Sequence, residues 1–216
     1  MALLYDAVLR PSKSEIIAGW APTQSWFAGD ATAEVERVAS FRFDDPAGEV
    51  GVETLLVRFG TGPLLQVALT YRGAPLVGGE DWLIGTMSHS VLGYRWVYDA
   101  TGDPVYLATT AAAALCGGRQ ADQFEQGDGE LIAIAPTATA VGSGTPGTPV
   151  PEQSSPISTV SRAGTTIART GAWHITLVRV LDGTATPPPA AAATLQGTWP
   201  EQSEPQLLAS VVILPS

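Results

Sequence analysis

The chain has 216 residues, of which 45% are hydrophobic, and its mean hydropathy of +0.15 indicates enough apolar side chains for a sizeable core. Eleven basic and 21 acidic residues give a net charge of −10, which disfavours nucleic acids and anionic membrane surfaces as partners. A single cysteine, Cys116, excludes an internal disulfide framework. No apolar run reaches the ~20 residues of a membrane helix, and the first residues lack the basic start of a signal peptide. We therefore expect a cytoplasmic protein.

The first third of the chain has the pattern of one helix followed by antiparallel strands. Ser12-Lys13-Ser14-Glu15 forms a capping-box pattern that predicts a helix start, and Pro22 ends that helix. Residues 35–43 and 50–59 are rich in β-branched and aromatic side chains, and residues 63–72 alternate between apolar and polar. The Asp-Asp-Pro-Ala-Gly sequence at 44–48 predicts a turn between the first two of these strands.

The stretch 66–115 predicts a strand, a turn, a second strand and a helix. Glycines and Pro75 interrupt the chain after residue 72, and an aromatic strand-like run follows Gly93. Asp103 is a good N-cap and Pro104 suits the first position of a helix that runs to about Leu115. A helix with several antiparallel strands predicts an α+β fold, and the order of the elements suits a cystatin-like unit, in which a helix packs on an antiparallel sheet.

The second half of the chain predicts strands and loops. Residues 137–155 are rich in Gly, Ser, Thr and Pro, which is typical of a flexible loop. Residues 157–169, 173–181 and 207–214 are strand candidates, and residues 184–194 contain three consecutive prolines. These strands lack a helix of their own to cover them, so we expect the helix at 104–116 to cover the second sheet and to hold the two halves together.

Few residues carry recognisable chemistry. His89 and His174 have no set of further metal ligands at a suitable spacing, and adjacent Ser88 and His89 would point to opposite faces of a strand. We predict no catalytic residues, no metal site and no cofactor. Aromatic side chains more often fill a core than bind a ligand, yet they are the best candidates for an interaction or ligand surface. The candidate surface residues are Trp82, His89, Tyr94, Trp96 and Tyr98.

Residues 10–115 resemble the N-terminal cap domain of maltokinases and related bacterial sugar kinases. The resemblance is carried by QVALTYRGAPL at 66–76, LIGT at 83–86, LGYRWVYDA at 92–100, DPVY at 103–106 and the Trp-Phe-Ala-Gly sequence at 26–29. Ser25 stands where the family usually has an arginine. The resemblance implies a cystatin-like cap of residues 1–118, which in the kinases precedes a kinase-like fold and performs no catalytic step.

Residues 119–216 resemble, weakly, the lobe that follows the cap in these kinases. Thr176 stands at the position of the phosphate-pairing lysine, and no acid lies between Asp182 and Glu201, where the kinases have a helix glutamate. Phosphoryl transfer needs such cations and metal-binding carboxylates. The chain also ends before the positions of the kinase catalytic lobe. We therefore expect a β-rich lobe that is a degenerate kinase lobe.

Three functions remain open at this point. The resemblance favours a non-catalytic accessory or regulatory protein that acts with a sugar kinase or a related protein of carbohydrate metabolism. The aromatic residues allow a module that binds a carbohydrate or an amino sugar. The third is an enzyme whose site is completed by another chain. A closed pocket lined by tryptophan and polar groups would favour the binding module.

Overall fold

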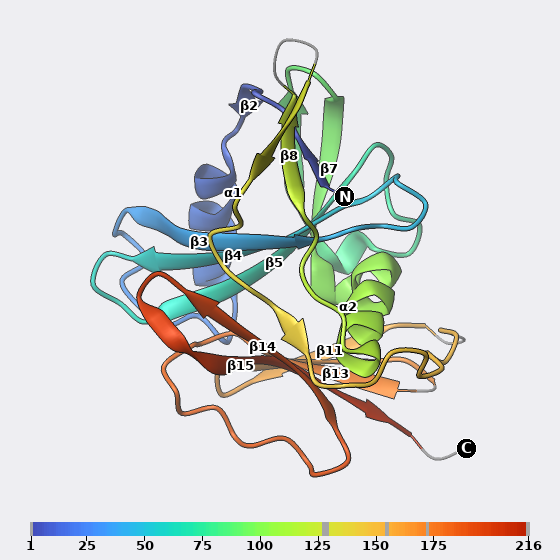
Figure 1. The fold of residues 1–216 in the computed structure, drawn as a ribbon. Coiled ribbons are helices and arrows are strands. Elements are labelled where there is room, and N and C mark those ends of the chain that lie inside the picture. The colour runs from blue at the N-terminus through green and yellow to red at the C-terminus, as the bar shows by residue number, and fades with distance from the viewer. Residues whose placement is uncertain (1, 127–129, 154–155, 172, 215–216) are drawn as a thin grey trace.

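A computed structural model describes residues 2–126, 130–153, 156–171 and 173–214 (Figure 1). Most of the fold is antiparallel sheet with few helices, so the predicted α+β class holds at that level. One six-stranded sheet, here called the first sheet, has the strand order β2-β6-β7-β5-β4-β3. Its strands are β2 Leu9–Arg10, β3 Val35–Phe43, β4 Gly51–Phe59, β5 Leu64–Arg72, β6 Leu83–His89 and β7 Gly93–Asp99.

Two α-helices pack against this sheet, and both begin where the sequence predicts. Helix α1, Lys13–Trp20, has Ser12 as N-cap with a complete capping box to Glu15. Helix α2, Pro104–Cys116, has Asp103 as N-cap and ends at Gly117, which adopts the left-handed conformation that glycine tolerates best. The buried residues Ile16 and Ile17 of α1 belong to a core cluster on one face of the first sheet. Short 3-10 helices follow at η1 Ala21–Thr23, η2 Glu80–Trp82 and η3 Ala100–Gly102.

The second sheet also has six strands and lies in the C-terminal half of the chain, with the order β10-β14-β15-β13-β12-β11. Its strands are β10 Val141–Gly142, β11 Ser158–Arg162, β12 Thr165–Arg169, β13 Trp173–Val178, β14 Ala193–Trp199 and β15 Gln202–Ile213. The predicted strand at 157–169 is in fact a hairpin, because Ala163 and Gly164 both have positive φ and form a tight turn. Strand β14 was not predicted from the sequence.

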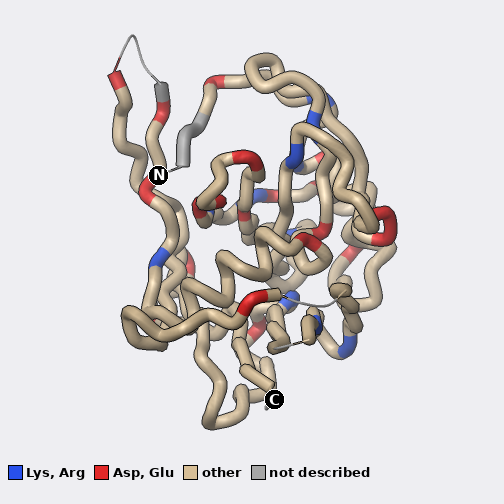
Figure 2. The backbone as a smooth tube through the Cα atoms, turned by 90° about the vertical axis from the view of Figure 1, so that its right-hand side faces the viewer, with Lys and Arg blue, Asp and Glu red and all other residues tan. Residues whose placement is uncertain are grey.

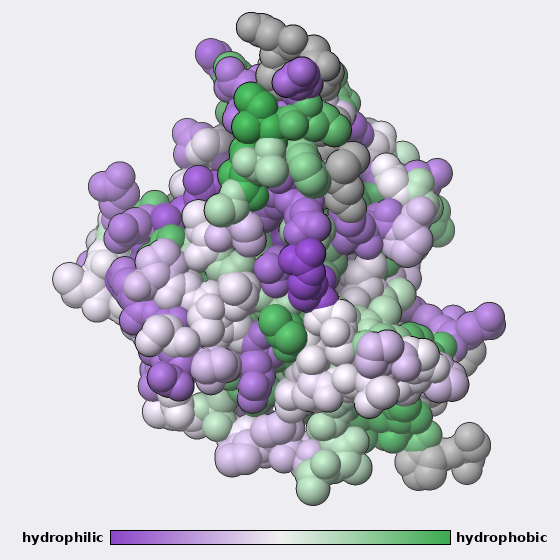
Figure 3. All heavy atoms as spheres, in the orientation of Figure 1, coloured by the Kyte–Doolittle hydropathy of each residue, from purple (hydrophilic) through white to green (hydrophobic). Residues whose placement is uncertain are grey.

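A third, small sheet joins the N-terminus to the middle of the chain. It consists of β1 Ala2–Leu4, β8 Gln123–Gln126 and β9 Leu131–Ile134, with β1 parallel to β8. Strand β9 is an edge strand, and its Leu131 and Ile132 are 48% and 57% exposed. Figure 3 shows hydrophobic atoms gathered at the top of the molecule, where Figure 1 places this sheet. The N-terminal arm, residues 2–10, is thus attached through β1 to β8.

Helix α2 lies between the first and second sheets, as we expected from the lack of a covering helix in the second half (Figure 1). One core cluster contains Phe41 and Leu56 of the first sheet, Leu107 and Ala111 of α2, and Leu177 of the second sheet. The helix therefore covers an apolar face of each sheet and buries side chains of both in one core. Each sheet needs such a cover because one of its faces is apolar.

Main-chain pairing also links the two sheets directly. The backbone N–H of Gln66 donates to the carbonyl of Arg179 at 2.8 Å, and that of Leu181 donates to the carbonyl of Leu64 at 2.8 Å. The buried amide of Gln66 donates further hydrogen bonds to the carbonyls of Val178 and Leu208. The division into two domains, residues 1–118 and 119–216, stays a prediction. The hydrogen bonds described here connect residues on the two sides of that boundary.

Residues 137–153 lie against α2 and the second sheet. The N–H groups of Gly144 and Thr145 donate to the carbonyls of Ala114 and Leu115, in the last turn of α2, at 2.9 and 3.0 Å. A Cβ atom on Gly144 would lie 1.9 Å from the Leu115 carbonyl oxygen, so only glycine permits this approach. A glycine that predicts flexibility from the sequence thus permits a close contact with α2 in the structure. The mobility of the loop in solution stays a prediction.

Within the described residues, no helix combines the length and apolar character needed to cross a bilayer. Figure 2 shows acidic residues in the upper, middle and lower parts of the backbone, so the net charge of −10 is distributed over the molecule.

Candidate functional site

The five predicted surface residues lie in four different places. Tyr94 is 54% exposed and packs edge-on against the half-buried Trp96, with ring centroids 4.9 Å apart. Tyr98 is buried in the core, where its hydroxyl accepts a hydrogen bond from the backbone N–H of Leu76, so we leave it out of any exposed surface. Trp82 and His89 line two separate cavities. The structure therefore brings Tyr94 and Trp96 together and separates the other three residues from them.

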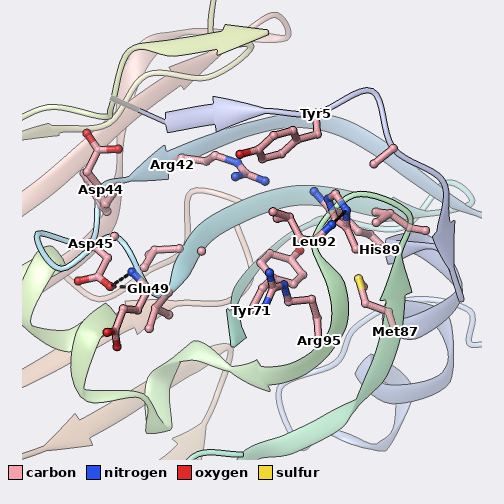
Figure 4. A pocket seen from close by; sticks show the side chains of 18 residues that line it. Tyr5, Arg42, Asp44, Asp45, Glu49, Tyr71, Met87, His89, Leu92 and Arg95 are labelled. Atoms are coloured by element: carbon pink, nitrogen blue, oxygen red, sulfur yellow. Dashed lines mark hydrogen bonds between the residues drawn. The ribbon is translucent and has the colours of Figure 1, made fainter. Parts of the chain in front are cut away.

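The larger cavity has a volume of about 490 Å³ and lies beside the N-terminal end of α1. In Figure 4, basic and aromatic side chains meet in its centre and on its right-hand side, while acidic side chains lie on the left. The first group comprises Tyr5, Arg42, Tyr71, His89 and Arg95, and the second comprises Asp44, Asp45 and Glu49. Lys13 also lines the cavity. The cavity thus collects three of the eleven lysines and arginines of an acidic protein.

A buried carboxylate, Glu53, underlies the basic side of this cavity. Its side chain is 4% exposed and accepts hydrogen bonds from Lys13 Nζ at 2.5 Å and from Tyr71 Oη at 2.8 Å. Arg42 lies 3.3 Å away from its Oε1 atom. Burial by itself would raise the pKa of Glu53, but the charges of Arg42 and Lys13, with the two hydrogen bonds, outweigh burial and lower it to about 2.

The partners of Glu53 are perturbed in turn. Burial lowers the pKa of Lys13 by more than the attraction of Glu53 raises it. Burial and then the negative charge of Glu53 hold the pKa of the Tyr71 hydroxyl well above its ordinary value. Two basic side chains, Lys13 and Arg42, thus share one carboxylate on this side of the cavity.

His89 is oriented by the turn between β6 and β7. Its Nδ1 atom accepts hydrogen bonds from the backbone N–H groups of Val91 and Leu92, at 3.2 and 3.0 Å. Because Nδ1 is an acceptor here, the neutral ring carries its proton on Nε2 and can donate from that atom. Burial and then the nearby charge of Arg95 lower the pKa of His89. The ring of Tyr5 packs edge-on against it, with centroids 6.0 Å apart.

The smaller cavity has a volume of about 380 Å³ and is formed by residues of both halves of the chain. Trp20 and Trp82 contribute aromatic rings, and the indole N–H of Trp82 donates to the hydroxyl of Thr159 at 2.9 Å. Hydroxyl groups and two carboxylates make up much of the remaining lining, namely Thr101, Ser158, Thr159, Ser161, Thr166, Asp81 and Asp99. This is a polar cavity with aromatic walls.

A buried ion pair lies next to this smaller cavity. Arg179 is fully buried and donates through Nη2 to both carboxylate oxygens of Asp99, at 2.8 and 2.6 Å. Its Nε donates to Thr166, and its guanidinium lies 4.8 Å from the ring centre of Trp26. The pair joins the first sheet to the segment after β13, so its position indicates a structural role.

Sequence reasoning found Trp82 and His89 but not the residues that surround them. Arg42, Tyr71 and Arg95 come from β3, β5 and β7, and only the pairing of these strands brings them to one cavity. Among the described residues, no group of three or more His, Cys, Asp and Glu side chains is arranged to hold a metal ion.

One comparison with known proteins gives a result for this chain. Residues 20–103 match the family described as the maltokinase N-terminal cap domain, which is less than half of the chain. The match covers η1, β3–β7 and η3, and it includes Arg42, Tyr71, His89 and Arg95. The chain matches no curated protein. Residues 20–103 are therefore similar to the maltokinase N-terminal cap domain, and the resemblance predicted from the sequence is confirmed over these residues.

Proposed function

We propose that the protein is a non-catalytic accessory module that binds a sugar kinase, or a related protein of carbohydrate metabolism, and modulates sugar or glucan phosphorylation. The observation that carries this proposal is the match of residues 20–103 to the cap domain of maltokinases. We also propose that α1 and the first sheet form a cystatin-like unit, since a helix followed by antiparallel strands packs on one face of the sheet. The cytoplasm, where sugar kinases act, is the location that this function requires.

The exposed aromatic side chains of β7 offer a contact surface for this partner. Tyr94 and Trp96 share one face of the strand, and Tyr94 is held by a hydrogen bond from its hydroxyl to Thr86 at 2.7 Å. Rigid, half-exposed aromatic side chains contribute large contact areas in protein interfaces. We therefore assign the partner surface to Tyr94 and Trp96.

The test uses purified protein and purified sugar kinases from the same cell. We expect one kinase to bind in calorimetry and to change its rate of phosphorylation when the protein is added. Tyr94→Ala should weaken that binding at least about tenfold, as for a central aromatic contact. Val160→Ala is the matched control, because Val160 is similarly exposed, at 51%, but lies in the second sheet. Equal weakening by both variants, or no binding by any kinase, would reject the proposal.

A second candidate function is a module that binds a carbohydrate or an amino sugar in the smaller cavity. It is favoured by the combination of Trp20 and Trp82 with hydroxyl groups and Asp81, since aromatic faces stack on sugar rings and carboxylates accept hydrogen bonds from hydroxyl or ammonium groups. Maltose and glucosamine should then quench tryptophan fluorescence in the wild type but not in Trp82→Phe. Trp96→Phe, outside the cavity, should respond like the wild type.

A further inference from the structure

The basic side of the larger cavity contains donors that the protein itself leaves unused. The Arg42 side chain is 17% exposed, yet among the described residues its guanidinium has one ionic contact, with Glu53 at 3.3 Å. A guanidinium has five N–H donors in a planar fork, and no nitrogen of Arg42 is among the buried atoms that lack a partner. The remaining donors of Arg42 are therefore open to the cavity and can bind an acceptor there.

The side chain of Arg95 makes no ion pair or hydrogen bond with any other described residue, although it lines the same cavity and its Nη1 atom packs close to Gly73. His89 adds an Nε2–H donor, because its Nδ1 is occupied by two backbone N–H groups. In Figure 4 the side chains of Arg42, Arg95 and His89 extend toward the same region of the cavity. Three basic side chains from three strands thus line one cavity, and among the described residues the ionic contact given for them is the one between Arg42 and Glu53.

Two of the acids at the other side of the cavity, Asp45 and Glu49, belong to the turn between β3 and β4. Asp45 accepts hydrogen bonds from the backbone N–H groups of Ala47, Glu49 and Val50, at 2.9 to 3.0 Å, so its carboxylate shapes the turn between β3 and β4. Glu49 is exposed on the same turn. Figure 4 shows both side chains pointing away from Arg95. The cavity is therefore polarised, with its positive end at Arg42, Arg95 and His89.

We propose that this cavity binds a small molecule through an oxyanion, either a phosphate monoester or a carboxylate, which Arg42, Arg95 and His89 hold by charge-assisted hydrogen bonds. Arginine matches both groups because its planar fork can donate two parallel hydrogen bonds. The volume of about 490 Å³ accommodates a ligand of monosaccharide size, and Tyr71 and Leu92 supply apolar wall for its uncharged part. This proposal does not depend on the kinase partner.

The experiment measures binding of three probes to the full-length protein by calorimetry. Glucose 6-phosphate represents the phosphate monoester, gluconate the carboxylate, and glucose the uncharged molecule of similar size. We expect at least one anionic probe to bind and glucose not to bind, and the tighter of the two anions identifies the oxyanion. Binding of glucose with equal affinity, or no binding of either anion at millimolar concentration, would overturn the proposal.

Two variants locate the site. Arg95→Gln should weaken binding of the anionic probe at least about tenfold, which is the loss expected for one charge-assisted hydrogen bond. Arg42→Lys should weaken this binding as well, because lysine keeps a charge near Glu53 but lacks the planar fork. Arg162→Gln is the matched control, since it removes the same charge from an exposed position in the second sheet. Equal effects of Arg95→Gln and Arg162→Gln, or no effect of either, would contradict the assignment.

Discussion

Arg179 and Asp99 form an ion pair in the buried layer between the two sheets. Replacing Asp99 by asparagine removes the counter-charge but leaves the guanidinium buried, and an uncompensated buried charge costs about 3–5 kcal/mol. We therefore predict that Asp99→Asn lowers the free energy of unfolding by about 3 kcal/mol or more in urea titrations.

The matched control for this prediction is Asp122→Asn. Asp122 pairs with Arg119 at 3.0 Å, but both side chains are about 60% exposed, so water can solvate the remaining charge. Exposed pairs contribute about 0–1 kcal/mol. A similar loss of stability in the two variants would mean that the Asp99–Arg179 pair is not buried in solution.

Glu53 makes stability depend on pH in a defined range. Its pKa is about 2 in the folded protein and 4.5 as an ordinary side chain, so the unfolded state binds the proton first as pH falls. The contribution of Glu53 is fully present above about pH 4.5 and is lost progressively toward pH 2, and its size is on the order of 3 kcal/mol.

This prediction is measured by guanidinium unfolding at several pH values between 6 and 2. The wild type should lose more stability over this range than Glu53→Gln, which has no carboxylate to protonate. Glu204→Gln, an exposed position, should follow the wild-type curve. If the curves of wild type and Glu53→Gln run parallel, the low pKa of Glu53 is wrong.

At the level of elements, the N-cap of α2 has more partners than a cap requires. Asp103 accepts a hydrogen bond from the backbone N–H of Val105, and it also accepts two from Arg72 and one from Thr70, all within 2.9 Å. The residue is fully buried. Asp103 thus connects the start of α2 to strand β5.

We predict that Asp103→Ala destabilises the protein by about 3 kcal/mol, because it removes a cap worth about 0.5–2 kcal/mol and leaves the guanidinium of Arg72 without its carboxylate. Ser12→Ala removes a cap of the same type from α1 at a more exposed site and should cost about 1 kcal/mol. Thermal and urea unfolding of both variants check the difference. Equal losses would show that the bonds to Arg72 and Thr70 add nothing to the cap.

The contrast between α2 and the loop beside it explains what the sequence could predict. Caps and alternation are local signals, so both helices and the strands β3, β4, β5 and β7 follow from the sequence, whereas β2 and β6 of the same sheet were not predicted. Gly144 carries no such signal, since the same residue suits a free loop and a close contact with the Leu115 carbonyl. Strand β14 was missed because it follows a proline run and because its pairing with β15 is visible only in three dimensions.

At the scale of the whole molecule, the residues that line a cavity together could not be predicted from the sequence. His89 could be singled out because histidine is rare in this chain, whereas Arg42 and Arg95 are ordinary strand residues until β3, β5 and β7 bring them to one cavity. The N-terminal arm adds Tyr5 through the parallel pairing of β1 with β8, for which the sequence has no pattern. Long-range convergence of this kind is determined by packing, not by local spacing.

The last prediction concerns the cooperation of the two halves. One core cluster contains residues of both sheets and of α2, and the side-chain NH2 group of Gln66 donates to two carbonyls of the second sheet. A fragment of residues 119–216 would expose the face that α2 covers and would lose these hydrogen bonds. We therefore expect the full chain to unfold in a single calorimetric transition.

The fragment of residues 119–216, expressed alone, should be insoluble or should unfold without a cooperative transition. Residues 1–118 provide the comparison, because the core cluster around Ile17, Trp26 and Leu69 lies entirely within them apart from Val180 at its margin. That fragment should retain more of its structure by circular dichroism and hydrogen exchange. A soluble fragment 119–216 with its own sharp melting transition would show that the second sheet is stable without α2, and that the shared core contributes contact but not cooperativity.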